Sequence, residues 1–545
     1  MDYTLFERPQ WNSGQMIAFS GLDGKTDYTQ GLVARTSLSP TGIEIVDPGK
    51  LSIAFKGKLT GPVIFGGDFF AVETEAGPVR GVVLDAFHIL IEGAAEVISH
   101  EDYIQYQEAD GRLLVGTATT FDASLITADL EDAFLARSEW IRTRELPTDL
   151  SPERLRTVVR ALTAMKSQIL SPEGKITHRW TTPDRWPHKD MWLWDTAFHA
   201  IGWRHIDPAL AMEMIDAMFD LQREDGFLTY RGTPEGPYFH LGDLLSQPPV
   251  LAIAVKLVHE VTKDDTWLKN IYPKLCAYLE WDLANRDLDG GGLVEWFIED
   301  NEECRSGESG MDNSPRFDDA VALDAVDFNA YLASEYQVIA AFATQLGLSD
   351  DADKWNARAS NFCSLIEGKL WSETEQFYCD LNPATDQQTA VLASSGFMPL
   401  LCGAPSQKRA EALEQNLFDP QRFGTALPVA SVAVCDSEHY EKDMWRGPTW
   451  ISINWLIAKG FERYGMENCF RSIRDRSVEE IEAKAEKYGT FFEYFDDRCE
   501  IDPPKLSRKG VCAPEISPYK QVIHEFGWSF TLYIDMVYST QLDHA

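Results

Sequence analysis

The sequence predicts a mainly α protein in which a closed helical toroid follows an N-terminal β-sandwich. Three observations support this fold class. Residues up to about 145 alternate apolar and polar side chains with the period of two that is typical of strands. From Ser151 onward, apolar residues recur with the period of about 3.6 that is typical of helices. Long polar loops separate the helical segments, as expected where antiparallel helix pairs close into a ring whose loops gather at one mouth.

The alternating pattern is clearest at residues 43–46, 51–55, 79–84 and 113–119. Turn-forming residues punctuate it: Asp-Pro-Gly at 47–49, paired glycines at 66–67 and Asp-Gly at 110–111. Short strands joined by tight turns favour antiparallel sheets stacked as a sandwich. We therefore expect a β-rich domain over residues 1–145.

The helical part opens with a clear start signal. Ser151 is a capping residue, and the proline after it suits the first turn of a helix. Val158, Leu162, Met165 and Ile169 then fall on one helical face. The same period returns at 210–221, 268–279, 328–346 and 355–370, and about a dozen helices follow one another to residue 538. We expect residues 146–545 to form a second, helical domain.

Composition narrows the function classes. The 545 residues carry a formal net charge of −37, which would repel nucleic acid and anionic membrane surfaces. Small neutral molecules are better candidate partners. The nine cysteines are scattered without paired spacing, and the N-terminus shows no basic segment followed by an apolar run, so we expect free thiols and a cytoplasmic protein. Assembly into a homo-oligomer is left open.

One polar segment, residues 308–318, has the character of an active-site loop. Turn-forming residues interrupt it, and the carboxylates Glu308, Asp312, Asp318 and Asp319 are expected to crowd around Arg316. Such crowding separates carboxylate pKa values, so that one acid is protonated while another is ionised, as general acid/base chemistry requires. The alternative is a solvated acidic loop, which is common in a chain with 86 Asp and Glu residues.

Three further loops interleave aromatic and charged residues, at 184–195, 440–450 and 488–497. A cleft that stacks sugar rings on aromatic faces and hydrogen-bonds their hydroxyls needs both residue types. A tryptophan-rich helix junction with buried ion pairs is the alternative for any one of them. Three such loops in one chain favour a carbohydrate site.

Five motifs between residues 150 and 540 resemble glycoside hydrolase family 63, a group of inverting α-glycosidases related to trehalases and glucoamylases. The motif-bearing strings are Trp194-Asp195-Thr-Ala-Phe198, Ser246-Gln247-Pro-Pro, Gly310-Met-Asp312-Asn-Ser-Pro-Arg316, Trp445-Arg446-Gly-Pro and Phe526-Gly-Trp528-Ser. The third is the most specific. The resemblance implies an (α/α)6 toroid for the helical part and does not extend to the β-rich start.

The resemblance also implies the catalytic pair. Asp312 corresponds to the general acid, and Glu493 in Phe-Phe-Glu-Tyr-Phe-Asp corresponds to the general base. Inversion needs a protonated carboxyl on one face of the sugar and a carboxylate that activates water on the other, about 6.5–9.5 Å apart. This chain departs from the family where Asp496-Asp497 replaces a proline-containing turn after the base.

The function that the resemblance implies is exo-acting hydrolysis of a small α-glucoside or α-mannoside, of the oligosaccharide or glycosyl-glycerate type, without a cofactor. The residues expected to line the sugar site are Trp192, Trp194, Asp195, Gln247, Arg316, Trp445, Arg446 and Trp450. Either arginine could instead pair with structural carboxylates, and each tryptophan could belong to the core. A polysaccharide lyase and a non-catalytic sugar-binding protein on the same toroid are the alternatives.

No metal site is expected. Residues 287–295, Asp-Leu-Asp-Gly-Gly-Gly-Leu-Val-Glu, resemble a calcium loop, but the oxygen-ligand spacing differs and a plain turn is favoured. His188, His199 and His205 lack the close spacing on one helical face that a zinc pair shows.

Overall fold

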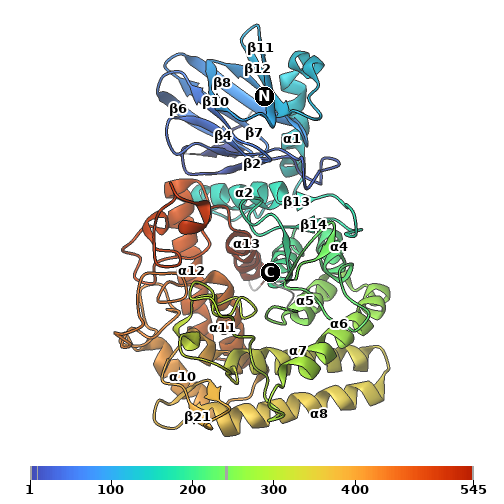
Figure 1. Cartoon of the computed structure of the whole chain (residues 1–545), viewed down its shortest axis with the longest axis vertical. Helices are drawn as coiled ribbons and strands as arrows, with labels where there is room; N and C mark the ends of the chain where they lie inside the picture. Colours follow the sequence, from blue (N-terminus) through green and yellow to red (C-terminus); the bar gives the residue numbers. More distant parts are fainter. Residues whose placement is uncertain (1–2, 9, 240–243, 543–545) are drawn as a thin grey trace. The chain divides into compact units, whose positions relative to one another are not determined.

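The computed structural model describes the chain except residues 1–2, 9, 240–243 and 543–545. The chain forms two compact units (Figure 1). The first comprises Met1–Met191, Ile481–Glu493 and Ile523–Ala545, and the second comprises Trp192–Glu480 and Tyr494–Val522. Helices account for about 40% of the residues and strands for about 19%, so the prediction of a mainly α protein is confirmed only in part.

Two antiparallel sheets form the N-terminal part of the first unit. Their strands are β1 (Glu7–Arg8), β2 (Met16–Ala18), β3 (Val33–Thr36), β4 (Gly42–Asp47), β5 (Leu51–Phe55), β6 (Leu59–Phe65), β7 (Phe69–Thr74), β8 (Gly77–Asp85), β9 (His88–Gly93), β10 (Ala95–His100), β11 (Ile104–Ala109) and β12 (Arg112–Thr117). The larger sheet has the order β1-β6-β7-β8-β9-β12-β11, and the smaller has the order β10-β5-β4-β3-β2. Apolar residues of both sheets share one core, as the alternating pattern predicts for a sandwich.

Helices α1 (Leu130–Arg142), α2 (Pro152–Ser167) and α13 (Gly527–Leu542) also belong to this unit. The predicted start of α2 is confirmed, because the Ser151 side chain accepts a hydrogen bond from the Arg154 amide and Pro152 lies in the first turn. The sequence analysis missed α1, which lies inside the stretch expected to be β-rich. The Asp129 side chain caps α1 by accepting from the Glu131 and Asp132 amides.

The second unit is built from helices and short strands. The helices are α3 (Leu193–Trp203), α4 (Pro208–Phe219), α5 (Leu251–Thr262), α6 (Asp265–Arg286), α7 (Val326–Gln345), α8 (Ser349–Leu365), α9 (Pro399–Cys402), α10 (Gln407–Phe418) and α11 (Ile451–Arg463), while α12 (Glu467–Tyr488) continues into the first unit. Short strand pairs are β13 (Ile169–Leu170) with β14 (Trp180–Thr181) in the first unit, and β16 (Arg231–Thr233) with β17 (Gly236–Pro237), β18 (Trp371–Ser372) with β19 (Phe377–Tyr378), and β20 (Leu381–Asn382) with β21 (Gln387–Gln388) in the second. β15 (Met191–Trp192) lies at the border of the units.

Consecutive helices pack in pairs within the second unit, α3 with α4 and α7 with α8. Figure 1 shows α7 and α8 side by side. The connections between these elements include the segments at 287–325 and 419–450, which carry the polar motifs. In the described part of the chain, none of the helices has the length and hydropathy needed to cross a bilayer.

Candidate active site

Asp312 lies in a turn between α6 and α7 in the second unit. The loop begins with Gly310, whose φ of +71° suits glycine. A Cβ built on Gly310 would lie 2.5 Å from the Trp194 ring, so only glycine lets the loop approach this tryptophan so closely. The 3-10 turn Pro315–Phe317 follows, and the Arg305 amide donates to the Asp312 carbonyl at 2.8 Å. The backbone around Asp312 is therefore fixed from both sides.

Asp312 is paired with a lysine that sequence reasoning missed. Lys509 Nζ lies 2.9 Å from Asp312 Oδ2, and the two side chains retain 18% and 23% of their surface, respectively. Burial raises the pKa of the Asp312 carboxyl, but the charge of Lys509 and its hydrogen bond outweigh this effect, so the pKa lies below its usual value. The neighbouring Arg508 acts in the same direction. The sequence signal is a pair of adjacent cations before a glycine in a strongly acidic chain.

Asn313 joins this loop to two others in the second unit. Its side-chain amide donates to Asp443 Oδ2 at 2.9 Å, and its side-chain carbonyl accepts from the Trp445 amide at 3.1 Å. The same Asp443 oxygen accepts from the Gly510 amide at 3.0 Å. The segments that carry Asp312, Trp445 and Lys509 therefore meet around one asparagine and one aspartate.

Arg316 does not collect the carboxylates expected around it. Its side chain is fully buried and forms ion pairs with Asp327 and Asp380, each at 2.7 Å. It also donates from Nε and Nη2 to Asp380 and from Nη2 to Asp327. The prediction that the carboxylates of this loop surround Arg316 is wrong, because the partners of Arg316 come from the start of α7 and from the segment after β19. Arg316 therefore links the loop to α7 and to the segment of Asp380. Direct contact between Arg316 and a sugar stays a prediction, and the burial of the side chain argues against it.

The other expected members of the cluster also have separate partners. Glu308 is buried and receives two hydrogen bonds from Arg286, at 2.8 and 2.6 Å. It also accepts from the Ser246 and Phe297 amides. Four donors on one buried carboxylate indicate a structural role. Asp318 and Asp319, by contrast, are exposed.

Arg446 forms an ion pair with Asp318 in the second unit. The Arg446 side chain retains 18% of its surface and Asp318 retains 34%, so the pair is open to solvent. An exposed pair of this kind contributes little to stability and can exchange partners with a ligand. Arg446 thus remains a candidate for substrate contact.

The expected tryptophans form a packed layer. Trp445 and Trp450 stack with ring centroids 3.8 Å apart, and Tyr494 packs against Trp450 at 4.7 Å. Trp194 lies 6.5 Å from Trp445. All three tryptophans are buried, so the ring faces between them are not free to stack on a sugar. Within the described residues, Trp445 Nε1 is buried without a hydrogen-bond partner.

Three more expected binding residues lie together at the start of α3. The Trp194 amide donates to Gln247 Oε1 at 3.2 Å, and Gln247 is buried. Asp195 follows in the first turn of α3 and is also buried. Trp192 is half-buried, with the Tyr230 ring edge-to-face at 5.4 Å. The structure therefore brings Trp192, Trp194, Asp195 and Gln247 into one neighbourhood, while their contact with a sugar stays a prediction.

Glu493 lies in the first unit, in the segment Ile481–Glu493. Its side chain and backbone are held by the start of α13 and the residues before it. The Trp528 indole donates to the Glu493 carbonyl at 3.0 Å, and the Ile523 amide points to Glu493 Oε2 at 3.4 Å. Ser529 Oγ donates to the preceding Phe492 carbonyl at 2.6 Å. The Phe-Gly-Trp-Ser motif at 526–529 thus positions the segment of the candidate base.

Asp496 and Asp497, which replace the turn usual in the family, are structural in the second unit. Lys442 forms ion pairs with both. Asp496 Oδ2 accepts from the Glu500 and Ile501 amides at 2.8 Å, and Tyr440 donates to Asp497 Oδ2 at 2.8 Å. Both carboxylates are therefore committed to protein partners.

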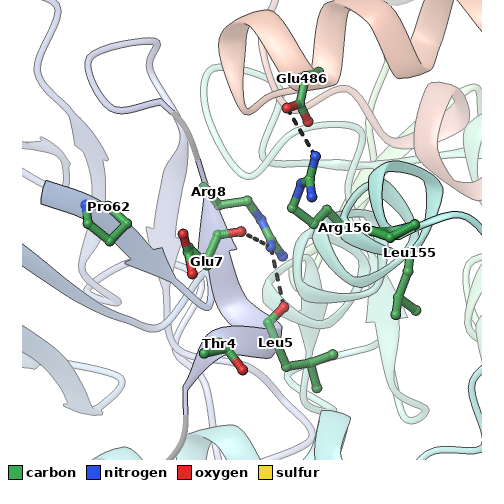
Figure 2. Close-up of a pocket in the computed structure, with 9 residues that line it drawn as sticks. Thr4, Leu5, Glu7, Arg8, Pro62, Leu155, Arg156 and Glu486 are labelled. Atoms are coloured by element: carbon green, nitrogen blue, oxygen red, sulfur yellow. Dashed lines mark hydrogen bonds and ion pairs between the residues drawn. The ribbon is translucent and has the colours of Figure 1, made fainter.

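A pocket of about 490 Å³ in the first unit contains none of the predicted site residues (Figure 2). Figure 2 shows Arg156 paired with Glu486 and Arg8 donating to the backbone carbonyls of Leu5 and Glu7. Of the two carboxylates that line the pocket, Glu7 and Glu486, the second is already bonded to Arg156, and none of the five motifs reaches the pocket. It is not a candidate active site.

The chain is similar to proteins of one enzyme family. Residues 187–499 match the model of the mannosylglycerate hydrolase MGH1-like glycoside hydrolase domain. The mannosylglycerate hydrolase MGH1 of Selaginella moellendorffii is 26% identical over 416 residues, which cover 61% of this chain and 82% of that protein. The glucosylglycerate hydrolase of Mycolicibacterium hassiacum is 24% identical over 434 residues, or 62% and 92% of the two chains.

A solved structure agrees with this assignment. The family 63 mannosylglycerate hydrolase of Thermus thermophilus, in complex with glucose, superposes with a TM-score of 0.56 at 25% identity. The superposition covers 70% of this chain and all of that one. The family model spans more than half of the 545 residues and includes both Asp312 and Glu493. The chain therefore belongs to the MGH1-like hydrolases of glycoside hydrolase family 63 and is an enzyme that hydrolyses glycosidic bonds.

Proposed function

We propose that the enzyme hydrolyses an α-glycoside of glycerate, α-mannosylglycerate or α-glucosylglycerate, with inversion at the anomeric carbon. The observation that carries this proposal is the cation beside the candidate acid. Lys509 lies 2.9 Å from Asp312, and Arg508 precedes it, in a chain whose net charge is −37. A glycerate leaving group carries a carboxylate close to the bond that breaks, and it needs a cation at that place.

Asp312 and Glu493 divide the chemistry. Asp312 gives its proton to the glycosidic oxygen as the bond to the anomeric carbon breaks, while Glu493 takes a proton from the water that attacks the opposite face. Inversion in general needs an acid and a base on opposite faces of the sugar, about 6.5–9.5 Å apart. The bracing of Glu493 by Trp528 and Ile523 supports its role as a fixed base.

Lys509 controls whether Asp312 is ionised or protonated. In the free enzyme its charge lowers the pKa of Asp312, so this carboxyl is ionised near neutral pH. When a glycerate carboxylate takes over Lys509, Asp312 loses its partner, its pKa rises, and it takes up a proton from solvent. Binding of a glycosyl-glycerate thus brings Asp312 into the protonated form that a general acid requires. A neutral glycoside leaves the ion pair of Asp312 and Lys509 in place.

Family membership removes the lyase and the non-catalytic alternatives, because the family consists of hydrolases. We place the enzyme in the cytoplasm, since all nine cysteines are free, as a reducing compartment permits.

A substrate panel tests the proposal. We expect kcat/KM for α-mannosylglycerate or α-glucosylglycerate to exceed that for the methyl α-glycosides by at least about 100-fold. A factor of this size corresponds to the upper part of the free-energy range of one hydrogen bond to a charged group. Proton NMR of the first product should show the β-anomer. A preference for neutral α-linked disaccharides would contradict the glycerate assignment, and the α-anomer as first product would contradict inversion.

A further inference from the structure

A second group of carboxylates lies in the connection between α6 and α7, in the second unit. The segment after α6 carries Asp287, Asp289 and Glu295 around a run of three glycines. Gly290 and Gly292 have φ values of +74° and +87°, which suit the sharp turn that glycine permits. The Gly291 amide donates to Asp289 Oδ1 at 2.6 Å. The turn directs the acidic side chains of one short loop toward a common region.

Asp324 completes the group from a different segment. Glu295 and Asp324 form an isolated antiparallel backbone bridge just before α7. One carboxylate oxygen each from Asp289, Glu295 and Asp324 lie within 4.8 Å of one another. Oxygen atoms at this spacing can share a single cation as ligands.

The electrostatics of this group are unbalanced. Glu295 and Asp324 are only 1% and 3% exposed. Within the described residues, Asp324 Oδ1 is buried without a hydrogen-bond partner, and Glu295 uses Oε2 to accept from the Leu288 amide at 2.8 Å. Lys369, which donates to the Gly291 carbonyl at 3.3 Å, supplies one positive charge. One lysine cannot neutralise three carboxylates at such short range, and an unpaired buried carboxylate is costly.

We propose that Asp289, Glu295 and Asp324 bind a divalent cation of the calcium type. Carboxylate and carbonyl oxygens are the ligands that calcium prefers, and a glycine-rich loop supplies the irregular geometry that calcium accepts more readily than magnesium. The site is independent of the proposed substrate and of the roles of Asp312 and Glu493.

Burial and the neighbouring carboxylates raise the pKa of Glu295 to about 7 and that of Asp324 to about 6. The charged groups that act on this pair are Asp287, Asp289, Asp380 and Lys369.

The site braces the catalytic loop through two short connections. Trp296, next to Glu295, donates its indole N–H to Asp327 Oδ1 at 3.0 Å. Asp327, three residues after Asp324, is a partner of Arg316 in the Asp312 loop. A cation that joins Glu295 to Asp324 would therefore stabilise the support of Arg316 without touching the substrate.

Calcium titration of the full-length, chelator-treated enzyme tests this site by calorimetry and thermal unfolding. We expect one bound calcium per chain and a rise in Tm of about 2–5 °C at a calcium concentration of about 100 times Kd. Magnesium should bind at least about tenfold more weakly.

Two variants and one control decide the assignment. Asp289→Asn alters an exposed ligand and should fold normally, while Asp324→Asn alters the buried one; both should weaken calcium binding at least about tenfold. Asp353→Asn, an exposed aspartate on α8, should bind calcium as the wild type does. Absence of binding to the wild type, or wild-type affinity in Asp289→Asn, would overturn the proposal.

Discussion

Replacing Lys509 with methionine separates the binding of glycerate from the chemistry of Asp312. The substitution removes the charge that lies 2.9 Å from Asp312 and keeps an unbranched apolar side chain. A hydrogen bond to a charged partner contributes about 1.5–3 kcal/mol. Loss of that contact should lower kcat/KM for the glycosyl-glycerate by about 10- to 150-fold, mainly through a higher KM.

On a neutral methyl α-glycoside, Lys509→Met should not lower kcat/KM but should change its pH dependence. Burial raises the pKa of Asp312, whereas Lys509 lowers it more strongly, so the variant has a higher Asp312 pKa. A general acid works while it is protonated. The high-pH limb of kcat/KM for the neutral substrate should therefore shift to higher pH in Lys509→Met, and activity near neutral pH should be kept or increased.

Lys505→Met is the matched control, because Lys505 is exposed in the same segment. Kinetics on both substrates, with product quantified by chromatography, should leave this variant at wild-type values. If Lys509→Met loses the same factor on glycosyl-glycerate and on the neutral glycoside, Lys509 does not recognise the glycerate carboxylate and the reasoning fails.

Three further predictions concern the roles of single residues. Asp312→Asn should reduce hydrolysis of glycosyl-glycerate by about 10²–10⁴-fold but spare a glycosyl fluoride, whose departure needs little protonation; equal losses would show that Asp312 only positions the substrate. Glu493→Gln should cost a similar factor on both substrates without a change in Tm, and near-normal turnover would contradict its role as base. Arg316→Met should destabilise the protein by about 3–5 kcal/mol in urea unfolding, because two buried carboxylates lose their partner, whereas Arg471→Met, at an exposed ion pair, should change stability by less than about 0.5 kcal/mol.

Local signals predicted the start of α2, but α1 and the short strands β13 to β21 were not predicted. Ser151 and Pro152 marked the start of α2 because capping depends on neighbouring residues alone. The same kind of signal precedes α1, where Asp129 is followed by Leu130 and Phe134 on one buried face. The change from the strand period to the helix period is clear only at Ser151, because strands dominate the residues before it. Asp129 and the spaced apolar residues after it nevertheless place the first helix earlier, at Leu130.

The contacts of the site that the sequence does not predict join residues that are far apart in the chain. Arg316 was expected to attract the carboxylates next to it, but Asp380 lies far along the chain and reaches it only through tertiary packing. Lys509 and Asp312 meet in the same way. The glycine-rich loop at 287–295 lacked a ligand in its own spacing, and Asp324 supplies it from the following segment. Spacing within a motif cannot reveal such a residue.

The pairing of charges around the loop supports the proposal that Asp312 is its reactive carboxylate. Glu308 and Arg316 and their partners are buried, and exchanging those partners would leave a charge unpaired at low dielectric. Asp312 and Lys509 keep about a fifth of their surface, so water and a substrate carboxylate reach them, and partner exchange costs much less. Buried pairs fix the backbone of the loop, and the one partly open pair is left to respond to the substrate. In the proposed mechanism, Lys509 therefore has two functions: it keeps Asp312 ionised in the free enzyme, and it leaves Asp312 for the substrate carboxylate when glycerate binds.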